Sequence, residues 1–182
     1  MSLPAARLAY PDPRTLFALF PPANDVPAFD YVSATAVPQP YHKLLVHKRH
    51  MTVTQEAYHG DKVDVRILER RLVGDFYARK ILLALHSTGK IVQFGIARIN
   101  LRYCTKAVRD EILAGQTPLG RILINHKILR RIEPTAYFRV TPSPAMLTWF
   151  NLDWPRVTYG RMGIIYCDER PAIEVLEIVA PE

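Results

Sequence analysis

The chain is poor in cysteine and has no long hydrophobic run. It holds two cysteines in 182 residues, Cys104 and Cys167, and neither lies in a C-x-x-C or C-x-x-H pattern. A zinc site or a redox pair is therefore not indicated, and we expect buried free thiols. No segment approaches the roughly 18 apolar residues that cross a bilayer, and the first residues lack the apolar core of a secretion signal. We expect a cytoplasmic protein without a membrane span.

Signatures of nucleotide binding and of hydrolytic catalysis are missing as well. The sequence has no Walker loop, no dinucleotide-binding fingerprint and no G-x-S-x-G elbow. His47 and His50 form a His-x-x-His pattern, but without a third ligand in view this pattern is more typical of a polar loop than of a metal site. The sequence predicts neither a metal nor a cofactor.

Basic residues outnumber acidic ones, and the formal net charge is +7 with a pI near 9.6. Such a charge favours an anionic partner, although a moderately basic protein needs no special partner. The basic residues form short pairs spread along the chain, namely Lys48-Arg49, Arg70-Arg71, Arg79-Lys80 and Arg130-Arg131. No basic helix and no Arg/aromatic repeat of the RNA-binding kind is present. A small anionic ligand therefore fits the sequence better than nucleic acid.

Prolines divide the chain into two parts. Eight of the fifteen lie within the first 40 residues, and the next is Pro118. We expect one domain over residues 41–182, preceded by a proline-rich arm, residues 1–40, that wraps it. Within the arm, the apolar residues 16–20 predict one or two helical turns, which Pro21 and Pro22 end.

Turn signals separate β-branched and apolar segments from residue 51 onward. The sequences His59-Gly60-Asp61 and Ser87-Thr88-Gly89-Lys90 are typical of turns between strands. They predict four strands in meander order, at 51–58, from 63 onward, at 77–86 and at 91–101.

Two helices and three more strands are expected after these four strands. Thr105 and Gly115 are typical of the start and the end of a helix, and a second helix is expected from Pro118 to about Asn125. Strand-like segments follow at 129–141, 161–168 and 172–180. The sequence thus predicts an α+β fold with a single antiparallel β-sheet and a helical pair inserted after the fourth strand.

The start of the second helix has the features of an anion site. We expect Thr117 to cap this helix and Pro118 to lie in its first turn. The backbone N–H groups of Leu119 and Gly120 are then left unpaired at the positive end of the helix dipole, and Gly120 has no side chain to keep an anion away. Such an end attracts an oxyanion, although most capped helices bind nothing.

Side-chain alternation places two charged residues on apolar strand faces. Glu177 falls in the apolar row of the last strand, and Arg79 falls in that of the strand 77–86. Each is costly if unpaired. Either the two form a structural ion pair, or they stand at opposite ends of a polar ligand, with Arg79 on a carboxylate and Glu177 on a hydroxyl. Arg98, on the face of Phe94 and Ile96, is either a second anion contact or a strand-end arginine facing water.

Aromatic residues gather in a proline-containing linker late in the chain. Trp149, Phe150 and Trp154 are close to prolines at 142, 144 and 155. They form either a lid over a pocket or a hydrophobic plug under a long loop, and the plug is favoured.

Four segments, taken in order, resemble chorismate pyruvate-lyase and its looser relatives. They are His50-Met51-Thr52, Y-A-R-K-I-L-L at 77–83, G-Q-T-P-L-G-R at 115–121 and L-E-I-V-A-P at 176–181. The resemblance runs from about residue 41 to the end, and T-P-L-G-R is its most specific part. It implies a single antiparallel sheet with helices, related to the ligand-binding domain of some transcription regulators. It also implies cofactor-independent conversion of chorismate to 4-hydroxybenzoate and pyruvate.

The resemblance implies roles for individual residues. Arg79 matches the arginine that grips the product carboxylate, and Glu177 matches the glutamate at the product hydroxyl. Met51 and Leu119 match backbone contacts to the product. Arg98 matches a further arginine, beyond a hairpin that is longer here. The proline-rich arm has no counterpart in the family, and the loop at 141–158 is longer than in bacterial lyases.

The predicted ligand is a small anionic aromatic or enolpyruvyl acid. As a lyase, the protein would remove a ring proton and break the ring C–O bond of the enolpyruvyl ether, so that enolpyruvate leaves. Arg79 and Glu177 would be catalytic residues, with Glu177 either holding the hydroxyl or acting as base. As an alternative, the same fold binds a small aromatic acid without turnover, as an effector-sensing module. Residues 1–40 are too rich in proline for a DNA-binding helix-turn-helix. A third possibility is an enzyme acting on a different aromatic or enolpyruvyl acid.

Overall fold

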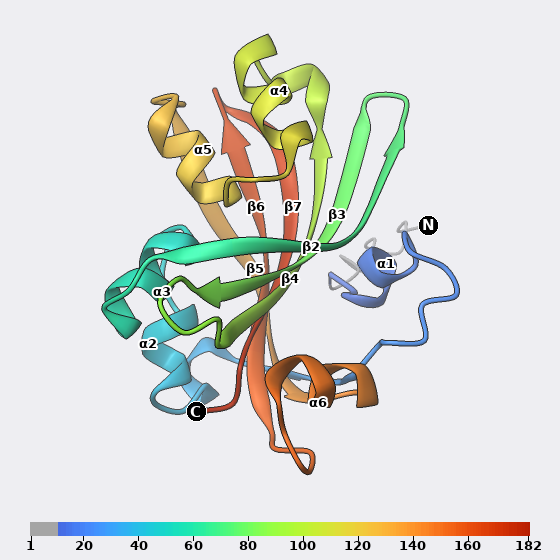
Figure 1. The fold of residues 1–182 in the computed structure, drawn as a ribbon, viewed down its shortest axis with the longest axis vertical. Coiled ribbons are helices and arrows are strands. Elements are labelled where there is room, and N and C mark those ends of the chain that lie inside the picture. The colour runs from blue at the N-terminus through green and yellow to red at the C-terminus, as the bar shows by residue number, and fades with distance from the viewer. Residues whose placement is uncertain (1–10) are drawn as a thin grey trace, which may run out of the picture.

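One antiparallel sheet forms the centre of the computed structural model, which describes residues 11–182. Within this part of the chain, the sheet has seven strands in the order β1-β5-β6-β7-β4-β3-β2 (Figure 1). They are β1 (Ala28–Val32), β2 (Val63–Val73), β3 (Phe76–Leu85), β4 (Ile91–Asn100), β5 (Arg130–Thr141), β6 (Thr158–Cys167) and β7 (Arg170–Val179). The predicted α+β class and single antiparallel sheet are confirmed.

The helices are short. They are α1 (Arg14–Phe17), α2 (Tyr41–Leu45), α3 (Met51–His59), α4 (Lys106–Ala114), α5 (Leu119–Asn125) and α6 (Pro144–Phe150), with 3-10 turns at Ala34–Ala36 and Leu101–Tyr103. The pair α4 and α5 follows the fourth strand, as predicted. Among residues 11–182, no helix combines the length and the apolar character needed to cross a bilayer.

The central strands are covered on both faces, because alternate side chains point to opposite sides. On β7, Ile173 and Val175 pack in one cluster with residues of α4 and α5. Leu176 and Ile178 pack in another cluster with residues of α1 and α6. A charged side chain that points into either cluster is therefore buried, and burying it without a partner is costly.

The segment from Met51 to Tyr58, predicted as a strand, is the helix α3, so this prediction is wrong. The run Thr52-Val53-Thr54 is β-branched, which favours a strand locally. The burial pattern is helical, however, because the neighbours Met51 and Thr52 are both buried while Val53 is 39% exposed. Gly60 ends the helix in a left-handed conformation with φ +65°, and its N–H donates to the carbonyl of Glu56.

The described part of the proline-rich arm packs onto the sheet. A helical turn is present as predicted, but it lies earlier than residues 16–20, because α1 begins at Arg14 and ends at Phe17. The rings of Phe17 and Phe94 stack at 5.7 Å. The arm also adds the strand β1, which was not predicted and pairs with β5 at the sheet edge. Residues 1–10 of the predicted arm lie outside the described part.

A buried ion cluster also holds the arm. Lys80 Nζ on β3 donates to Asp25 Oδ2 of the arm at 2.5 Å and to Glu69 Oε2 on β2 at 2.6 Å. The Lys80 side chain is 3% exposed and faces the side of the sheet that α1 covers.

The aromatic linker forms the plug rather than the lid. The helix α6 places Trp149 against Phe94, with the rings stacked at 5.2 Å, and buries Met146 and Phe150 in the same cluster as α1. Trp154 is 64% exposed. Cys104 and Cys167 are free thiols, as expected, but only Cys167 is buried and Cys104 is partly exposed.

Candidate functional site

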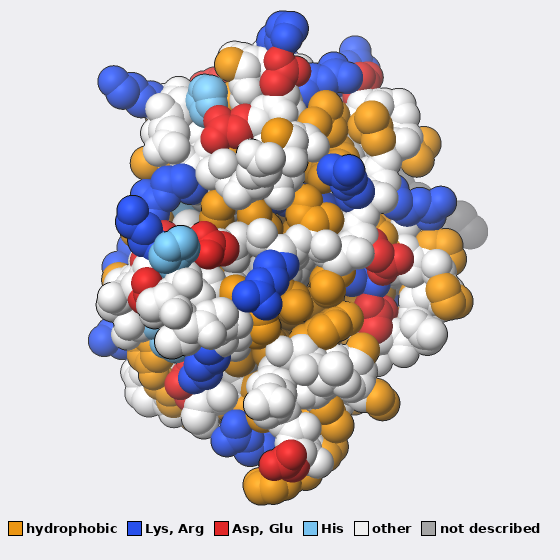
Figure 2. Space-filling view, in the orientation of Figure 1, with side chains coloured by type: hydrophobic (Ala, Val, Ile, Leu, Met, Phe, Trp, Pro, Cys, Tyr) orange, Lys and Arg blue, Asp and Glu red, His pale blue; other side chains and the backbone are white. Residues whose placement is uncertain are grey.

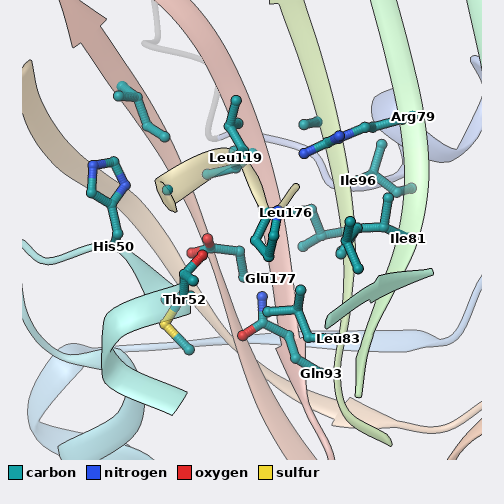
Figure 3. Close-up of a pocket in the computed structure, with 18 residues that line it drawn as sticks. His50, Thr52, Arg79, Ile81, Leu83, Gln93, Ile96, Leu119, Leu176 and Glu177 are labelled. Carbon is teal, nitrogen blue, oxygen red and sulfur yellow. The ribbon is translucent and has the colours of Figure 1, made fainter. Parts of the chain in front are cut away.

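A cavity lies between the sheet and the starts of two helices. Its walls come from β2, β3, β4, β6 and β7 on the sheet side and from the starts of α3 and α5 on the other (Figure 3). Its volume, counted as the space that the centre of a water molecule can occupy, is about 60 Å³. This is several times the minimum for one water, so the space suits a ligand of about one ring.

The start of α5, which the sequence predicts as an anion site, lies at this cavity, but its N-cap is not the predicted residue. Pro118 is the N-cap of α5, and no side chain caps the helix, so the predicted capping by Thr117 is wrong. A proline at the N-cap, with φ −57° and ψ 140°, already turns the chain into the helix. Leu119, Gly120 and Pro118 all line the cavity.

Gly120 allows α5 to approach the start of α3. A Cβ atom at this position would lie 2.8 Å from Thr52 Oγ1 and 2.9 Å from His50 Cβ, which leaves no room for a side chain. Arg121 of α5 forms an ion pair with Glu56 of α3, which ties the two helices together. The T-P-L-G-R motif therefore joins the helix starts, and both Met51 and Leu119 line the cavity.

Arg79 reaches into the cavity from β3. Its side chain runs toward Leu119 (Figure 3) and the residue is 2% exposed. Its Nη1 is buried without a hydrogen-bond partner among residues 11–182. Burial lowers the pKa of this guanidinium below its usual value, although an arginine remains protonated in proteins. A buried cation without a partner is costly, so the geometry favours an anion in this cavity.

Glu177 lines the cavity from β7, on the side of Thr52 (Figure 3). It pairs with Arg161 of β6, whose Nε donates to Glu177 Oε2 at 2.7 Å. Of the two alternatives for Arg79 and Glu177, the structural ion pair between them is wrong. The sheet order explains this, because β4 separates β3 from β7, a distance of about 10 Å, whereas Arg161 lies directly opposite Glu177 on the neighbouring strand.

Arg161 was not singled out from the sequence, although a signal was present. It alternates along β6 with the same parity as Ile165 and Cys167, which are both buried in the cluster under α4 and α5. The reasoning that found Arg79 and Glu177, a charge in an apolar row, applies to it equally.

The structure does not bring Arg98 into the cavity. Its side chain is 47% exposed, and its Nη2 donates to Glu174 Oε2 at 2.8 Å. Phe94 and Ile96, which share its parity on β4, belong to the cluster on the other side of the sheet. Of the two alternatives for Arg98, the structure shows an arginine at the surface.

The remaining polar groups of the cavity are neutral. Gln93 of β4 accepts a hydrogen bond from Gln55 of α3, with 3.2 Å between Gln55 Nε2 and Gln93 Oε1. His50, just before α3, accepts a hydrogen bond at Nε2 from Arg130 Nε at 2.7 Å. Burial, then Arg130 and Arg161, lower the pKa of His50 to about 4, so the ring is uncharged at neutral pH. Among residues 11–182, no group of three His, Cys, Asp or Glu is placed to hold a metal.

The uncharged His50 makes the protein less stable in mild acid. Its folded-state pKa of about 4 lies below the ordinary 6.5, so between these values the unfolded state binds the proton and the folded state does not. The free energy of unfolding then falls as pH falls through this window, by up to about 1.4 kcal/mol per pH unit for one histidine. In urea unfolding at pH 7, 6 and 5, the free energy of unfolding should fall less steeply with pH in His50→Gln than in the unchanged protein.

His47 should lower the stability in mild acid in the same way, because burial and then Arg161 lower its pKa to about 4. The double variant His47→Gln/His50→Gln should therefore lose more of the pH dependence than either single variant. A slope between pH 7 and 5 that is the same in the double variant and in the unchanged protein would contradict the prediction.

Several solved structures share the fold. PhnF from Mycobacterium smegmatis matches with a TM-score of 0.55 and 11% identity over 72% of this chain and 63% of that chain. The effector domain of PhnF matches with a TM-score of 0.51 and 11% identity, over 72% of this chain and 88% of that domain. The ligand-binding domain of a protein described as a GntR-family transcriptional regulator from Bordetella bronchiseptica matches with a TM-score of 0.50 and 14% identity, over 64% and 85% of the two chains.

The chain has the fold of a GntR-regulator effector domain. This effector-domain fold is the one that the resemblance predicted, since it implied a relation to the ligand-binding domain of transcription regulators. No protein-family model and no curated protein sequence matches the chain. At sequence identities this low, a match shows that the fold is shared and nothing more. This chain covers less than two thirds of the PhnF chain.

Proposed function

We propose that the protein binds a small aromatic monocarboxylate with a hydroxyl group opposite the carboxylate. The observation that carries this is Arg79, a buried guanidinium that faces a cavity and whose Nη1 lacks a partner among residues 11–182. A carboxylate is a suitable partner, because it accepts two parallel hydrogen bonds from a guanidinium. Glu177 lies at the other side of the cavity and is an acceptor for a hydroxyl donor.

The charges of the cavity favour one carboxylate over two. Among residues 11–182, its lining holds one cation, Arg79, and one anion, Glu177. Arg98 lies at the surface, and Arg161 is bonded to Glu177. A second carboxylate would be buried without a cationic partner, which is costly. The Lys and Arg side chains of the surface are scattered among acidic and apolar ones on the face shown in Figure 2, so they do not form a continuous anion path there.

The effector-domain fold supports binding without turnover, because the structures that share it are described as the effector domain of PhnF and as the ligand-binding domain of a GntR-family transcriptional regulator from Bordetella bronchiseptica. A second candidate is the lyase, and it is favoured by one observation. Four of the five positions matched by resemblance, Met51, Arg79, Leu119 and Glu177, line a single cavity, while the fifth, Arg98, lies at the surface. In that case Arg79 would orient the carboxylate, and Glu177 would hold the hydroxyl or take the ring proton.

Two assays test these proposals. Calorimetry should show binding of 4-hydroxybenzoate and none of phenol, which keeps the ring and hydroxyl but lacks the carboxylate. Incubation with chorismate, followed by chromatography and mass analysis, then separates the candidates: pyruvate and 4-hydroxybenzoate indicate the lyase, and unchanged chorismate indicates binding alone. Equal binding of phenol and 4-hydroxybenzoate would overturn the proposed role of Arg79.

A further inference from the structure

Arg161 makes more hydrogen bonds than an ion pair with one glutamate requires. The residue is 2% exposed, and its Nε donates to Glu177 Oε2 at 2.7 Å. Its Nη1 donates to the carbonyl oxygens of Leu45 at 3.0 Å and His47 at 2.8 Å. Its Nη2 donates to the carbonyl oxygen of Arg49 at 3.0 Å. One guanidinium thus joins a cavity-lining carboxylate to three backbone carbonyls.

Two of these carbonyls, those of His47 and Arg49, belong to the segment that leads into α3, and the third, that of Leu45, lies at the end of α2. Residues 46–50 connect α2 to α3, and the first residues of α3, Met51 and Thr52, line the cavity together with His50. The position of this wall therefore depends on Arg161, which lies on the sheet. A lysine could not replace it, because one ammonium group lacks the planar fork that reaches both the carboxylate and the carbonyls.

The hydrogen bond from Arg161 to Oε2 also fixes the orientation of the Glu177 carboxylate. With Oε2 held by Arg161, the carboxylate cannot rotate freely, and Oε1 is left available to a ligand as a hydrogen-bond acceptor. A fixed acceptor selects a ligand that donates at this point, and a ligand without a donor leaves the acceptor unmatched.

We propose that Arg161 is a positioning residue that sets the ligand preference of the cavity. It orients Glu177 to accept from a ligand hydroxyl, and it holds residues 46–50 so that the start of α3 closes the opposite wall. This inference rests on the proposed binding of a hydroxyl-bearing aromatic carboxylate. It goes beyond that proposal by assigning the preference for the hydroxyl to a residue that does not line the cavity.

A cycle of two ligands and two variants tests the assignment. Calorimetry compares 4-hydroxybenzoate with benzoate, which lacks the hydroxyl, in the unchanged protein, in Arg161→Lys and in Arg98→Lys. Arg98 is a matched control, because it too pairs with a glutamate across neighbouring strands but lies outside the cavity. In the unchanged protein and in Arg98→Lys, the hydroxyl should raise affinity about tenfold or more. In Arg161→Lys, this ratio should fall to within about twofold.

A purely structural role for Arg161 would weaken both ligands by the same factor and leave the ratio unchanged, and that result would overturn the proposal. Equal affinity of the two ligands for the unchanged protein would also overturn it. If Arg161→Lys does not fold, Arg161→Gln, which removes the charge but keeps an amide donor, replaces it in the cycle.

Amide hydrogen exchange tests the second half of the proposal without a ligand. Exchange of the amides of residues 46–50 should be about tenfold or more faster in Arg161→Lys than in Arg98→Lys. Equal exchange in the two variants would overturn the holding role. If the unchanged protein binds neither ligand, the proposed function fails, and the exchange result alone decides whether Arg161 positions the α3 segment.

Discussion

Replacing Arg79 by methionine should stabilise the empty protein and at the same time abolish binding of 4-hydroxybenzoate. The side chain is 2% exposed and its Nη1 lacks a partner within residues 11–182, so an apolar side chain of similar length removes the cost of burying a charge. We expect the free energy of unfolding to rise by about 1–3 kcal/mol. Loss of two charge-assisted hydrogen bonds should lower affinity roughly 100-fold or more. Urea unfolding and calorimetry measure the two effects.

The next residue, Lys80, provides a control for which the change in stability should have the opposite sign. Lys80 is a cation on the same strand and is as deeply buried, but it bonds to Asp25 and Glu69 on the other face of the sheet. Lys80→Met leaves Asp25 buried without its partner and should lower the free energy of unfolding by about 3–5 kcal/mol. A loss of stability of similar size in Arg79→Met would show that Arg79 has a structural partner, and the ligand assignment would fail.

Truncating Phe17 in the proline-rich arm should destabilise the protein by about 3–5 kcal/mol. This ring is fully buried and stacks on Phe94 of β4 at 5.7 Å, so Phe17→Ala opens a cavity in the core that α1 and α6 share. Thermal unfolding of Phe17→Ala measures the effect. Trp154→Ala is the control, because Trp154 is 64% exposed and its removal should change stability by less than about 0.5 kcal/mol. Similar melting temperatures for the two variants would show that the arm contributes little to the core.

Elements whose signals are local were predicted well from the sequence. The helix α4 begins and ends as expected, because the Thr105 hydroxyl accepts from the N–H of Val108 and Gly115 adopts φ +70°. Such caps depend on a few neighbouring residues. The strand β1 was missed because its pairing with β5 joins distant parts of the chain, and α3 was missed because tertiary burial overrides its β-branched run.

The sequence predicted which residues belong to the candidate site better than it predicted the contacts among them. Parity alone identified Arg79 and Glu177, and the structure brings both to one cavity. Parity cannot say which strands are neighbours, so it did not predict that Arg161 pairs with Glu177. It also cannot say which face of the sheet holds the cavity, and this is why Arg98 was considered as a site residue.

The pairing of β1 with β5 imposes an order on folding. The register joins Ala28 to Thr141, so the arm cannot complete its edge of the sheet until the ribosome has made β5. Until then, Phe29 of β1 lacks Phe138 of β5, the ring that it contacts edge-on at 5.4 Å. Contacts of such long sequence separation slow folding, because the entropy of closing the loop is lost before they form. A nascent chain truncated before residue 130 should therefore expose β1 to proteolysis.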